Sequence, residues 1–478
     1  MQRPEEFKSS EINAKVGEKR DPMKSSKNSW FITRQSEKES NARTYAKNFK
    51  IAIDQARGIY VKDVDGNLYF DCLCGAGALG LGHNHPVVKE AILKVINADI
   101  PLLTLDITTP VKDQFVEYLF TLLPEEFAKD ARIQFCGPSG ADAIEAALKL
   151  VKIATGRSGI MAFSGGFHGQ TNGALALMGN TNTKSSVPGL MPNVNFLPFP
   201  YQYRNPMGIS GAEDCDVACI NYIENLLCDD ESGIVKPAAV ILEAVQGEGG
   251  VIPASNFFMR EIRRITKEHD IILIIDEVQA GIGRTGKMFA FEHSGITPDV
   301  VVLSKAIGGS LPLAVMVYNK KLDVWKPGAH TGTFRGNQLA LATGHATLKF
   351  IKENNLSERA MDLGKIFKAN FEKMQQAIKS IGDIRVRGLM IGIELINPDL
   401  PKNRLGHPAG FPELARKMRE ECLNRGLIVE LGGRRSSVVR MFPPLIITEE
   451  QIKQVCTIFT EALVAAEAAT SLEKVKVS

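Results

Sequence analysis

The chain has 478 residues, of which 44% are hydrophobic and 23% charged, enough for one large core or two to three domains. Its 57 basic and 54 acidic residues leave a net charge of only +3, which gives no argument for nucleic acid or an acidic surface as partner. The eight cysteines lack the spacing and histidine partners of a zinc site, so we expect reduced thiols and no metal.

The N-terminal stretch "MQRPEEFKSSEINAKVGEKRDP" is polar and mixed in charge, without the apolar segment of a secretory signal. Residues 1 to about 30 are predicted to form a loosely attached arm. No apolar run approaches the 18 residues of a membrane span. We therefore expect a soluble cytoplasmic protein without membrane contact.

The first predicted element is a hairpin over residues 58–71, where two β-forming runs flank Asp65-Gly66. From Arg132 onward, apolar runs of strand length alternate with helical patterns. The predicted strands cover residues 132–137, 158–163, 193–199, 238–245, 271–278 and 300–306. The predicted helices cover residues 140–155 and 257–270, and beyond about Thr343 helices dominate, with strand-like stretches at 385–396 and 437–447.

Apolar strands separated by helices indicate a parallel sheet that is covered on both faces. We predict an α/β fold with a large domain over residues 76–345. The N-terminal segment 1–75, with its arm and hairpin, and the C-terminal segment 346–478 are predicted to form a smaller α+β domain.

Ligands of open α/β sheets bind at the carboxyl ends of the strands. The predicted strand ends carry a set of polar or aromatic residues: Ser139, Phe167, His168, Glu243, Gln246, Glu248, Asp276, Glu277, Gln279 and Lys305. A lysine at the end of a buried strand should be paired, deprotonated or covalently used, because an isolated buried ammonium is costly. Lys305 could form a Schiff base, or its chain could simply reach the surface.

Each of the other candidates also has a plain structural alternative. Gly140 and Ala141 open a helix whose N–H groups could bind phosphate, or Ser139 or Asp142 could cap that helix. Asp276 could pair with a protonated ring nitrogen or with an ordinary cation. Phe167 could stack on a planar ligand or belong to the core, and His168 could be an ordinary hydrogen-bonded residue.

Taken together, these candidate residues indicate one kind of site more specifically than any of them does alone. A phosphate site, an acid for a ring nitrogen, a stacking aromatic ring and an imine-forming lysine together describe a site for pyridoxal phosphate. The sequence therefore predicts a pyridoxal phosphate enzyme in which Lys305 is linked covalently to the cofactor.

The motifs at this site resemble those of the class III (ω-amino acid) aminotransferases of fold type I. The resemblance covers about Phe31 to Ala466 and rests on the segments "EAVQGEGG", "IILIIDEVQAGIGRTGKMFAFEH", "TPDVVVLSKAIGGSLPLAV" and "HTGTFRGNQLA". The segments "DCLCGAGALGLGHNHP", "LDITTPVKDQF" and "QFCGPSGADAIEAALKL" are similar to those of family members that transfer the terminal amine of diaminobutyrate to 2-oxoglutarate. The family's large domain has a mostly parallel seven-stranded sheet.

The resemblance implies a role for each matching residue. Lys305 would hold the cofactor as an imine, Asp276 would pair with its ring nitrogen and Gln279 would bond its phenolic oxygen. Phe167 would stack on the ring beside His168. The phosphate would bind at Ser139, Gly140 and Ala141, and Thr333 would reach the neighbouring subunit's phosphate, which implies a homodimer with active sites at the interface.

The resemblance also implies which residues bind the substrates. Glu248 would mask Arg440 while a terminal amine reacts and would release it for the α-carboxylate of glutamate. Gln170 stands where ornithine and 4-aminobutyrate enzymes often carry arginine, so a diaminobutyrate substrate is favoured and the second carboxylate of 2-oxoglutarate has no assigned partner. Tyr45 and Arg43 are further candidates for substrate contact.

Another ω-aminotransferase, or an aminomutase or racemase of the same fold, stays open as an alternative. A nucleotide-binding protein is disfavoured because the P-loop pattern GxxxxGK[ST] does not occur.

Overall fold

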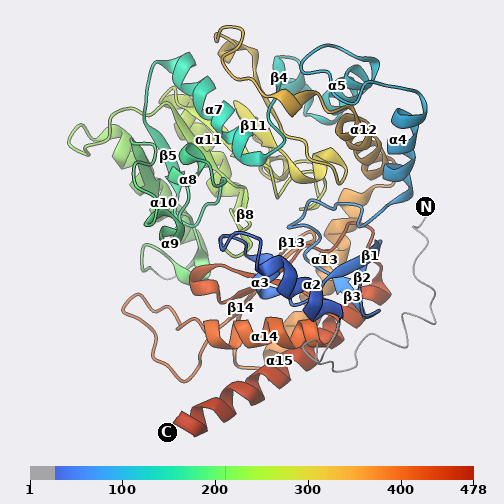
Figure 1. The fold of residues 1–478 in the computed structure, drawn as a ribbon. Coiled ribbons are helices and arrows are strands. Elements are labelled where there is room, and N and C mark those ends of the chain that lie inside the picture. Colours follow the sequence, from blue (N-terminus) through green and yellow to red (C-terminus); the bar gives the residue numbers. More distant parts are fainter. Residues whose placement is uncertain (1–26, 210, 478) are drawn as a thin grey trace.

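The computed structural model describes residues 27–209 and 211–477, and Figure 1 shows the path of the chain. The predicted N-terminal arm lies outside these residues up to residue 26, and its last residues belong to helix α2. The α-helices are α2 (Lys27–Ser36), α3 (Tyr45–Asn48), α4 (Pro86–Asn97), α5 (Pro110–Leu122), α6 (Glu125–Ala128), α7 (Gly140–Thr155), α8 (Asn172–Ala176), α9 (Thr181–Lys184), α10 (Ala212–Cys228), α11 (Asn256–Glu268), α12 (Gln338–Glu353), α13 (Leu356–Ala377), α14 (Pro412–Asn424) and α15 (Glu449–Val477).

The strands divide between the two ends of the chain and its middle. They are β1 (Ile53–Arg57), β2 (Tyr60–Asp63), β3 (Leu68–Asp71), β4 (Ala131–Phe135), β5 (Ile160–Phe163), β6 (Val194–Leu197), β7 (Ala239–Leu242), β8 (Val245–Gln246), β9 (Ile252–Pro253), β10 (Ile272–Asp276), β11 (Val300–Leu303), β12 (Val315–Asn319), β13 (Ile381–Arg387), β14 (Met390–Leu395), β15 (Leu427–Ile428), β16 (Glu430–Gly432) and β17 (Val438–Met441).

The middle of the chain forms a seven-stranded sheet with the order β4-β12-β11-β10-β7-β5-β6. Strands β6, β5, β7, β10 and β11 are mutually parallel, whereas β12 runs antiparallel to both β11 and β4. The prediction of a mostly parallel seven-stranded sheet is thus confirmed. Strand β12 was absent from the predicted strands; it pairs antiparallel with the strand before it, so no crossover helix marks it in the sequence.

The two faces of this sheet are buried in separate hydrophobic cores. Val301 and Leu303 of β11 belong to the core that also contains the apolar face of α11. Val300 and Val302, which point the opposite way, belong to the core formed with α7. Because helices cover both faces, polar side chains at the carboxyl ends of the strands are directed to one edge of the sheet.

The N-terminal strands share a sheet with a C-terminal strand. Strands β2 and β3 form the predicted hairpin, and β3 pairs in parallel with β15 through Phe70–Leu427 and Asp71–Ile428. In Figure 1 the blue N-terminal elements accordingly lie beside the orange and red C-terminal ones. The pairing agrees with a shared small domain, but the boundaries near residues 75 and 345 stay a prediction.

A second small sheet has the order β13-β14-β17-β16. The stretch 385–396, expected as one strand, in fact contributes to two antiparallel strands, β13 and β14. Gly388 lies in the turn between them with φ +58°, a conformation that glycine adopts without strain. The turn was missed because glycine is the only turn-forming residue type in this stretch, which contains no proline, asparagine, aspartate or serine.

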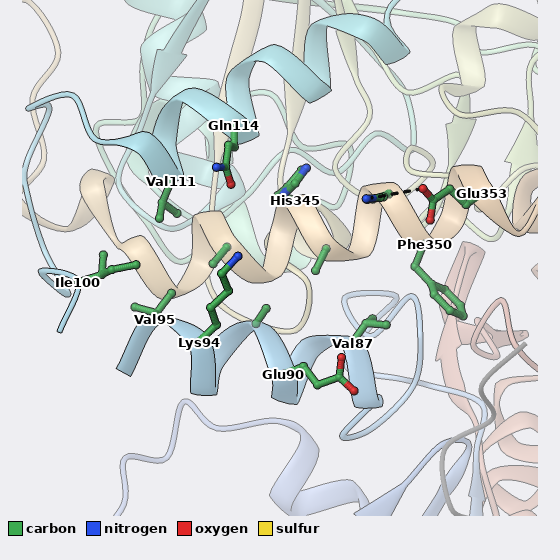
Figure 2. A pocket seen from close by; sticks show the side chains of 14 residues that line it. Val87, Glu90, Lys94, Val95, Ile100, Val111, Gln114, His345, Phe350 and Glu353 are labelled. Atoms are coloured by element: carbon green, nitrogen blue, oxygen red, sulfur yellow. Dashed lines mark ion pairs between the residues drawn. The ribbon is translucent and has the colours of Figure 1, made fainter. Parts of the chain in front are cut away.

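Helices α4, α5 and α12 enclose a pocket of about 460 Å³ that none of the predicted site residues lines. Figure 2 shows apolar residues such as Val95 and Ile100 in it, with an ion pair between Lys349 and Glu353 at 3.8 Å. Within the described residues, no helix combines the length and apolar character that crossing a bilayer requires. The eight cysteines are free, and Cys228 alone among them is exposed.

Candidate active site

Lys305 lies directly beyond the carboxyl end of β11. Its φ of +51° is in the left-handed region, which is uncommon for residues other than glycine and is often found at functional sites. The preceding Ser304 is held in place because its Oγ donates to the Leu313 carbonyl at 2.9 Å. Burial lowers the pKa of the Lys305 amine, although the charges of Glu248 and Asp276 oppose this. The environment therefore favours a neutral, nucleophilic amine.

Asp276 is the last residue of β10 and lies on the same edge. Its Oδ2 accepts a hydrogen bond from Nδ1 of His168 at 2.8 Å, and its Oδ1 accepts one from the Val278 amide at 3.0 Å. Burial lowers the pKa of His168, but the hydrogen bond to Asp276 and its charge outweigh burial, so the pKa is raised. Nε2 of His168 is buried without a hydrogen-bond partner among the described residues. These two hydrogen bonds fix the orientation of the Asp276 carboxylate at the strand end.

Glu243, at the end of β7, organises two neighbouring loops. Its Oε1 accepts from the Phe167 amide at 2.9 Å and its Oε2 from the Gly247 amide at 2.9 Å. Burial raises its pKa to about 7. The sequence identified Glu243 only as a strand-end acid, because binding to two backbone N–H groups leaves no sequence pattern. Through these bonds Glu243 positions the half-buried ring of Phe167.

Gln279 lies three residues after Asp276 in the chain. It is buried, and its Nε2 donates to the Ala76 carbonyl at 3.0 Å. Its side chain also packs so closely on Gly247 that a Cβ at that position would collide with Oε1. Gln279 is therefore fixed beside the turn that Glu243 holds.

The N-terminus of α7 offers unused backbone donors. The first helical hydrogen bond runs from the Ala143 amide to the Ser139 carbonyl at 3.2 Å, so the amides of Gly140 and Ala141 precede the helical ladder. Ser139 occupies the N-cap position without a side-chain hydrogen bond to the helix. The Asp142 carboxylate does not take the capping role either, because it accepts from the Gly137 amide at 2.6 Å. This end of α7 can bind an anion.

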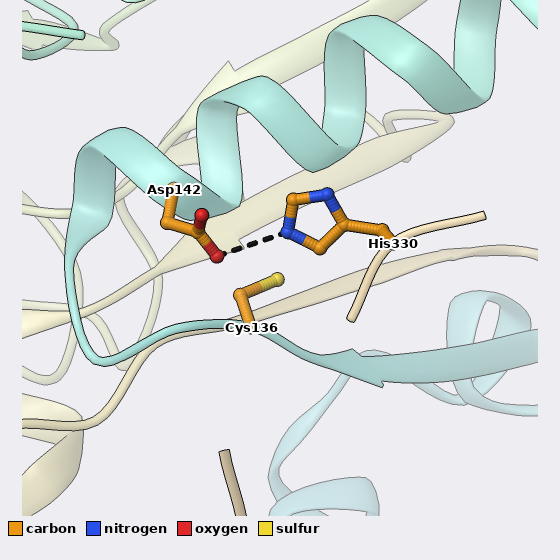
Figure 3. A group of neighbouring side chains, drawn as sticks. All are labelled: Cys136, Asp142 and His330. Carbon is orange, nitrogen blue, oxygen red and sulfur yellow. Dashed lines mark hydrogen bonds and ion pairs between the residues drawn. The ribbon is translucent and has the colours of Figure 1, made fainter. Parts of the chain in front are cut away.

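Asp142 also joins this helix end to the loop that contains Thr333. Oδ2 of Asp142 accepts from Nε2 of His330 at 2.9 Å, and Figure 3 shows the Cys136 thiol beside them. Polar atoms of these three residues lie within 4.8 Å of one another. Burial raises the pKa of Cys136, so it stays a thiol at neutral pH. Thr333 itself is exposed.

Glu248 and Arg440 form a two-fold hydrogen-bonded ion pair close to Lys305. Nη1 and Nη2 of Arg440 donate to Oε1 and Oε2 of Glu248 at 2.8 and 2.7 Å. Arg440 is only 2% exposed. Burial raises the pKa of Glu248, but Arg440 outweighs it and the pKa is lowered. The arginine predicted for the α-carboxylate is thus masked by the predicted glutamate.

The other residues predicted to contact substrate lie at different positions relative to the Glu248–Arg440 pair. Tyr45 is 48% exposed; burial of its hydroxyl and the nearby charges of Glu248 and Glu430 raise its pKa, so it lies beside the pair. Arg43 pairs with Glu39 at 3.0 Å, and its contact with substrate stays a prediction. Gln170 is exposed and lines a pocket of about 540 Å³ together with Phe167 and Glu248.

The site fits pyridoxal phosphate. Lys305 has no ion pair or side-chain hydrogen bond to any residue that the structure describes, and the first amides of α7 are similarly available. A buried carboxylate, a half-buried aromatic ring and a fixed amide surround the lysine. These are the groups that a phosphorylated pyridine aldehyde requires.

The family model "Aminotransferase class-III" matches residues 41–463. The chain is 52% identical over 428 residues to the diaminobutyrate–2-oxoglutarate aminotransferase of Rhizobium meliloti (strain 1021), covering 90% of this chain and 91% of the relative. It is 48% identical over 440 residues to the enzyme of that name from Haemophilus influenzae, covering 92% and 96%. Its fold is similar to an amine transaminase from an uncultivated Pseudomonas species in the PLP-bound form (TM-score 0.78, 26% identity, 90% and 98% covered). The chain therefore belongs to the class III aminotransferases.

Proposed function

We propose that this enzyme transfers the terminal amino group of L-2,4-diaminobutyrate to 2-oxoglutarate, giving aspartate 4-semialdehyde and glutamate in a reversible ping-pong cycle. The names of the relatives from Rhizobium meliloti and Haemophilus influenzae support this substrate pair. The observation that carries it is the Glu248–Arg440 pair, because an arginine masked by a glutamate suits an enzyme with one substrate that lacks a carboxylate next to its reacting carbon and one that has it.

The cofactor is pyridoxal phosphate, which when bound supplies an electron sink for the carbon that loses its proton. Lys305 would hold it covalently, Asp276 would face its ring nitrogen, and Gln279 its phenolic oxygen. Ser139, Gly140 and Ala141 would bind the phosphate at the start of α7. Phe167 would cover the ring, held there by the Glu243 carboxylate.

Several residues would take part in the proton transfer. Lys305 Nζ would take the proton from the reacting carbon of the substrate, a role that is helped by the burial that lowers the pKa of the amine. The hydrogen bond from His168 would hold the Asp276 carboxylate in the orientation that faces the ring nitrogen. The residues around Lys305 would orient the breaking C–H bond of the substrate.

Glu248 and Arg440 select the substrate for each half-reaction. When diaminobutyrate presents its terminal amine, its reacting carbon carries no carboxylate and the ion pair stays closed. When glutamate presents its α-amine, the α-carboxylate needs Arg440, and Glu248 moves aside. Gln170 supplies hydrogen bonds without charge, which suits a substrate whose carboxylate has an ammonium group beside it.

Turnover assays of purified enzyme with diamines and ω-amino acids test the proposal. We expect diaminobutyrate with 2-oxoglutarate to be the best pair, well above 4-aminobutyrate and ornithine. Faster reaction with either of these would favour the corresponding ω-aminotransferase. Turnover of the donor without any keto acid would instead support an aminomutase or racemase.

The enzyme is further proposed to act as a cytoplasmic homodimer with active sites at the interface. Free cysteines suit a reducing compartment, and the exposed Thr333 suits a residue that reaches a neighbouring subunit's phosphate. Subunit exchange between inactive Lys305→Ala and Thr333→Asp variants should restore part of the activity, because one hybrid site then carries both lesions and the other none. Absence of recovery, with exchange verified by native mass spectrometry, would place Thr333 in its own subunit's site.

A further inference from the structure

The two proposed substrates share a feature that the site described so far does not serve. In diaminobutyrate, three carbon–carbon bonds separate the reacting carbon from the carboxylate carbon. In 2-oxoglutarate, three such bonds also separate the reacting carbon from the distal carboxylate carbon. Both substrates therefore place a carboxylate at the same distance from the chemistry. Arg440 serves the carboxylate next to the reacting carbon, so the distal one needs another cation.

Arg434 is an arginine with no anionic partner in the part of the chain that the structure describes. It lies between β16 and β17 and lines the pocket of about 540 Å³ that also contains Phe167, Gln170 and Glu248. Its guanidinium rests against Gly165, where an added Cβ would lie 2.6 Å from Nη1, and it faces the ring of Tyr201 at 5.9 Å. The pocket thus contains a positioned guanidinium.

The nearby acids are already engaged by other arginines. Glu394 accepts from Arg385 at 2.9 Å and also binds Arg204 and the Tyr201 hydroxyl. Asp383 is bound by Arg385 at 2.6 Å, and Glu248 is bound by Arg440. Burial lowers the pKa of Arg434. A partly buried guanidinium without a carboxylate partner is a favourable site for a carboxylate from outside the protein.

The loop around Arg434 is held in an unusual conformation. Gly433, Arg435 and Ser436 all have positive φ, at +68°, +58° and +55°. Left-handed backbone at residues other than glycine costs energy and is concentrated at functional sites. Here it holds Arg434 over Gly165 while its neighbour Arg435 is exposed.

We propose that Arg434 binds the distal carboxylate of the substrate in both half-reactions, the α-carboxylate of diaminobutyrate in one and the distal carboxylate of 2-oxoglutarate or glutamate in the other. It thereby takes the place left by Gln170, which lies in the same pocket but carries no charge. For diaminobutyrate, the assignment rests on the proposed function. For 2-oxoglutarate and glutamate, it rests only on the need to bind a second carboxylate.

The test compares each substrate with its decarboxylated analogue on the purified holoenzyme. The donors are diaminobutyrate and 1,3-diaminopropane, and the acceptors are 2-oxoglutarate and 2-oxobutyrate. Arg434→Gln should lower kcat/KM about 10- to 100-fold for both carboxylate-bearing substrates, mainly through KM, because a charge-assisted hydrogen bond is lost. The two analogues should change less than about threefold. Arg434→Lys should retain part of the preference.

Arg435→Gln is the matched control, since it removes the adjacent charge from the same loop, and it should change all four values by less than about threefold. Equal losses for substrates and analogues, unchanged preference in Arg434→Gln, or an equal effect of Arg435→Gln would each overturn the assignment. If wild-type enzyme fails to use diaminobutyrate, the proposed function is wrong, but the comparison of 2-oxoglutarate with 2-oxobutyrate still decides the role of Arg434.

Discussion

The strand edge formed by β7, β10 and β11 differs in construction from the opposite wall, formed by residues 431–440. On the strand edge, Asp276 and Glu243 hold fixed hydrogen bonds to backbone amides. On the opposite wall, Arg440 is held by the carboxylate of Glu248, and Arg434 has no carboxylate partner among residues 27–209 and 211–477. Under the proposed function, the reaction chemistry would be built on the strands, whereas substrate choice would depend on charges that exchange partners. Substitutions on the strand edge should therefore affect every substrate, and substitutions on the wall should affect substrates selectively.

The largest effect is expected for Lys305→Ala. The loss of proton transfer alone should reduce turnover by about 10²–10⁴-fold with every donor, and loss of the covalent link to the cofactor should reduce it further. Steady-state assays measure the loss. Borohydride reduction of wild-type enzyme followed by peptide mapping should place the pyridoxyl group on Lys305, and a label on another lysine would refute its role.

Asp276→Asn should come next and should also affect all substrates. Losing a buried charge partner costs about 3–5 kcal/mol, so turnover should fall by about 10²–10⁴-fold while the fold persists. The pKa of His168 should fall as well, because the hydrogen bond and charge that raise it are weakened. Single-turnover rates and an NMR titration of His168 measure the two effects, and near-normal turnover in a folded variant would contradict the assignment.

Glu248→Ala should separate the two half-reactions. An unmasked Arg440 favours the α-carboxylate of glutamate, so the glutamate half-reaction should gain about tenfold relative to the diaminobutyrate half-reaction. Rates of the two half-reactions, measured separately under single-turnover conditions, test this. Equal changes in both would show that the pair is structural and not a switch.

The last prediction concerns stability and not activity, namely the pH dependence of unfolding that Glu243 causes. Its pKa is raised from 4.5 in the unfolded chain to about 7 in the folded one, so its contribution to stability is fully present below pH 4.5 and is lost as pH rises through about 7. Glu243→Gln cannot ionise. The free energy of unfolding of wild type relative to this variant should therefore fall by roughly 2–3 kcal/mol between pH 5 and pH 8. A difference that is constant or rises with pH would contradict the assignment.

The sequence predicted the strand edge better than the wall, for a physical reason. Parallel strands bring their carboxyl ends together, so Lys305 and Asp276 could be placed from local patterns alone. Arg434 could not, because the residues that position it, Gly165 and Tyr201, lie more than two hundred residues away. Glu243 was noticed as a strand-end acid, but its function depends on backbone amides, whose positions no residue type reveals.

The parallel pairing of β3 with β15 has a consequence for the order in which the chain folds. The amides of Phe70 and Cys72 donate to the carbonyls of Gly426 and Ile428, and the Cys72 carbonyl accepts from the Phe442 amide at 2.6 Å. During synthesis the hairpin is made early, yet one edge of it stays unpaired until nearly the whole chain has left the ribosome. An open edge is a surface on which other chains can pair. A nascent chain stalled before residue 427 should therefore need a chaperone more than one stalled after residue 442.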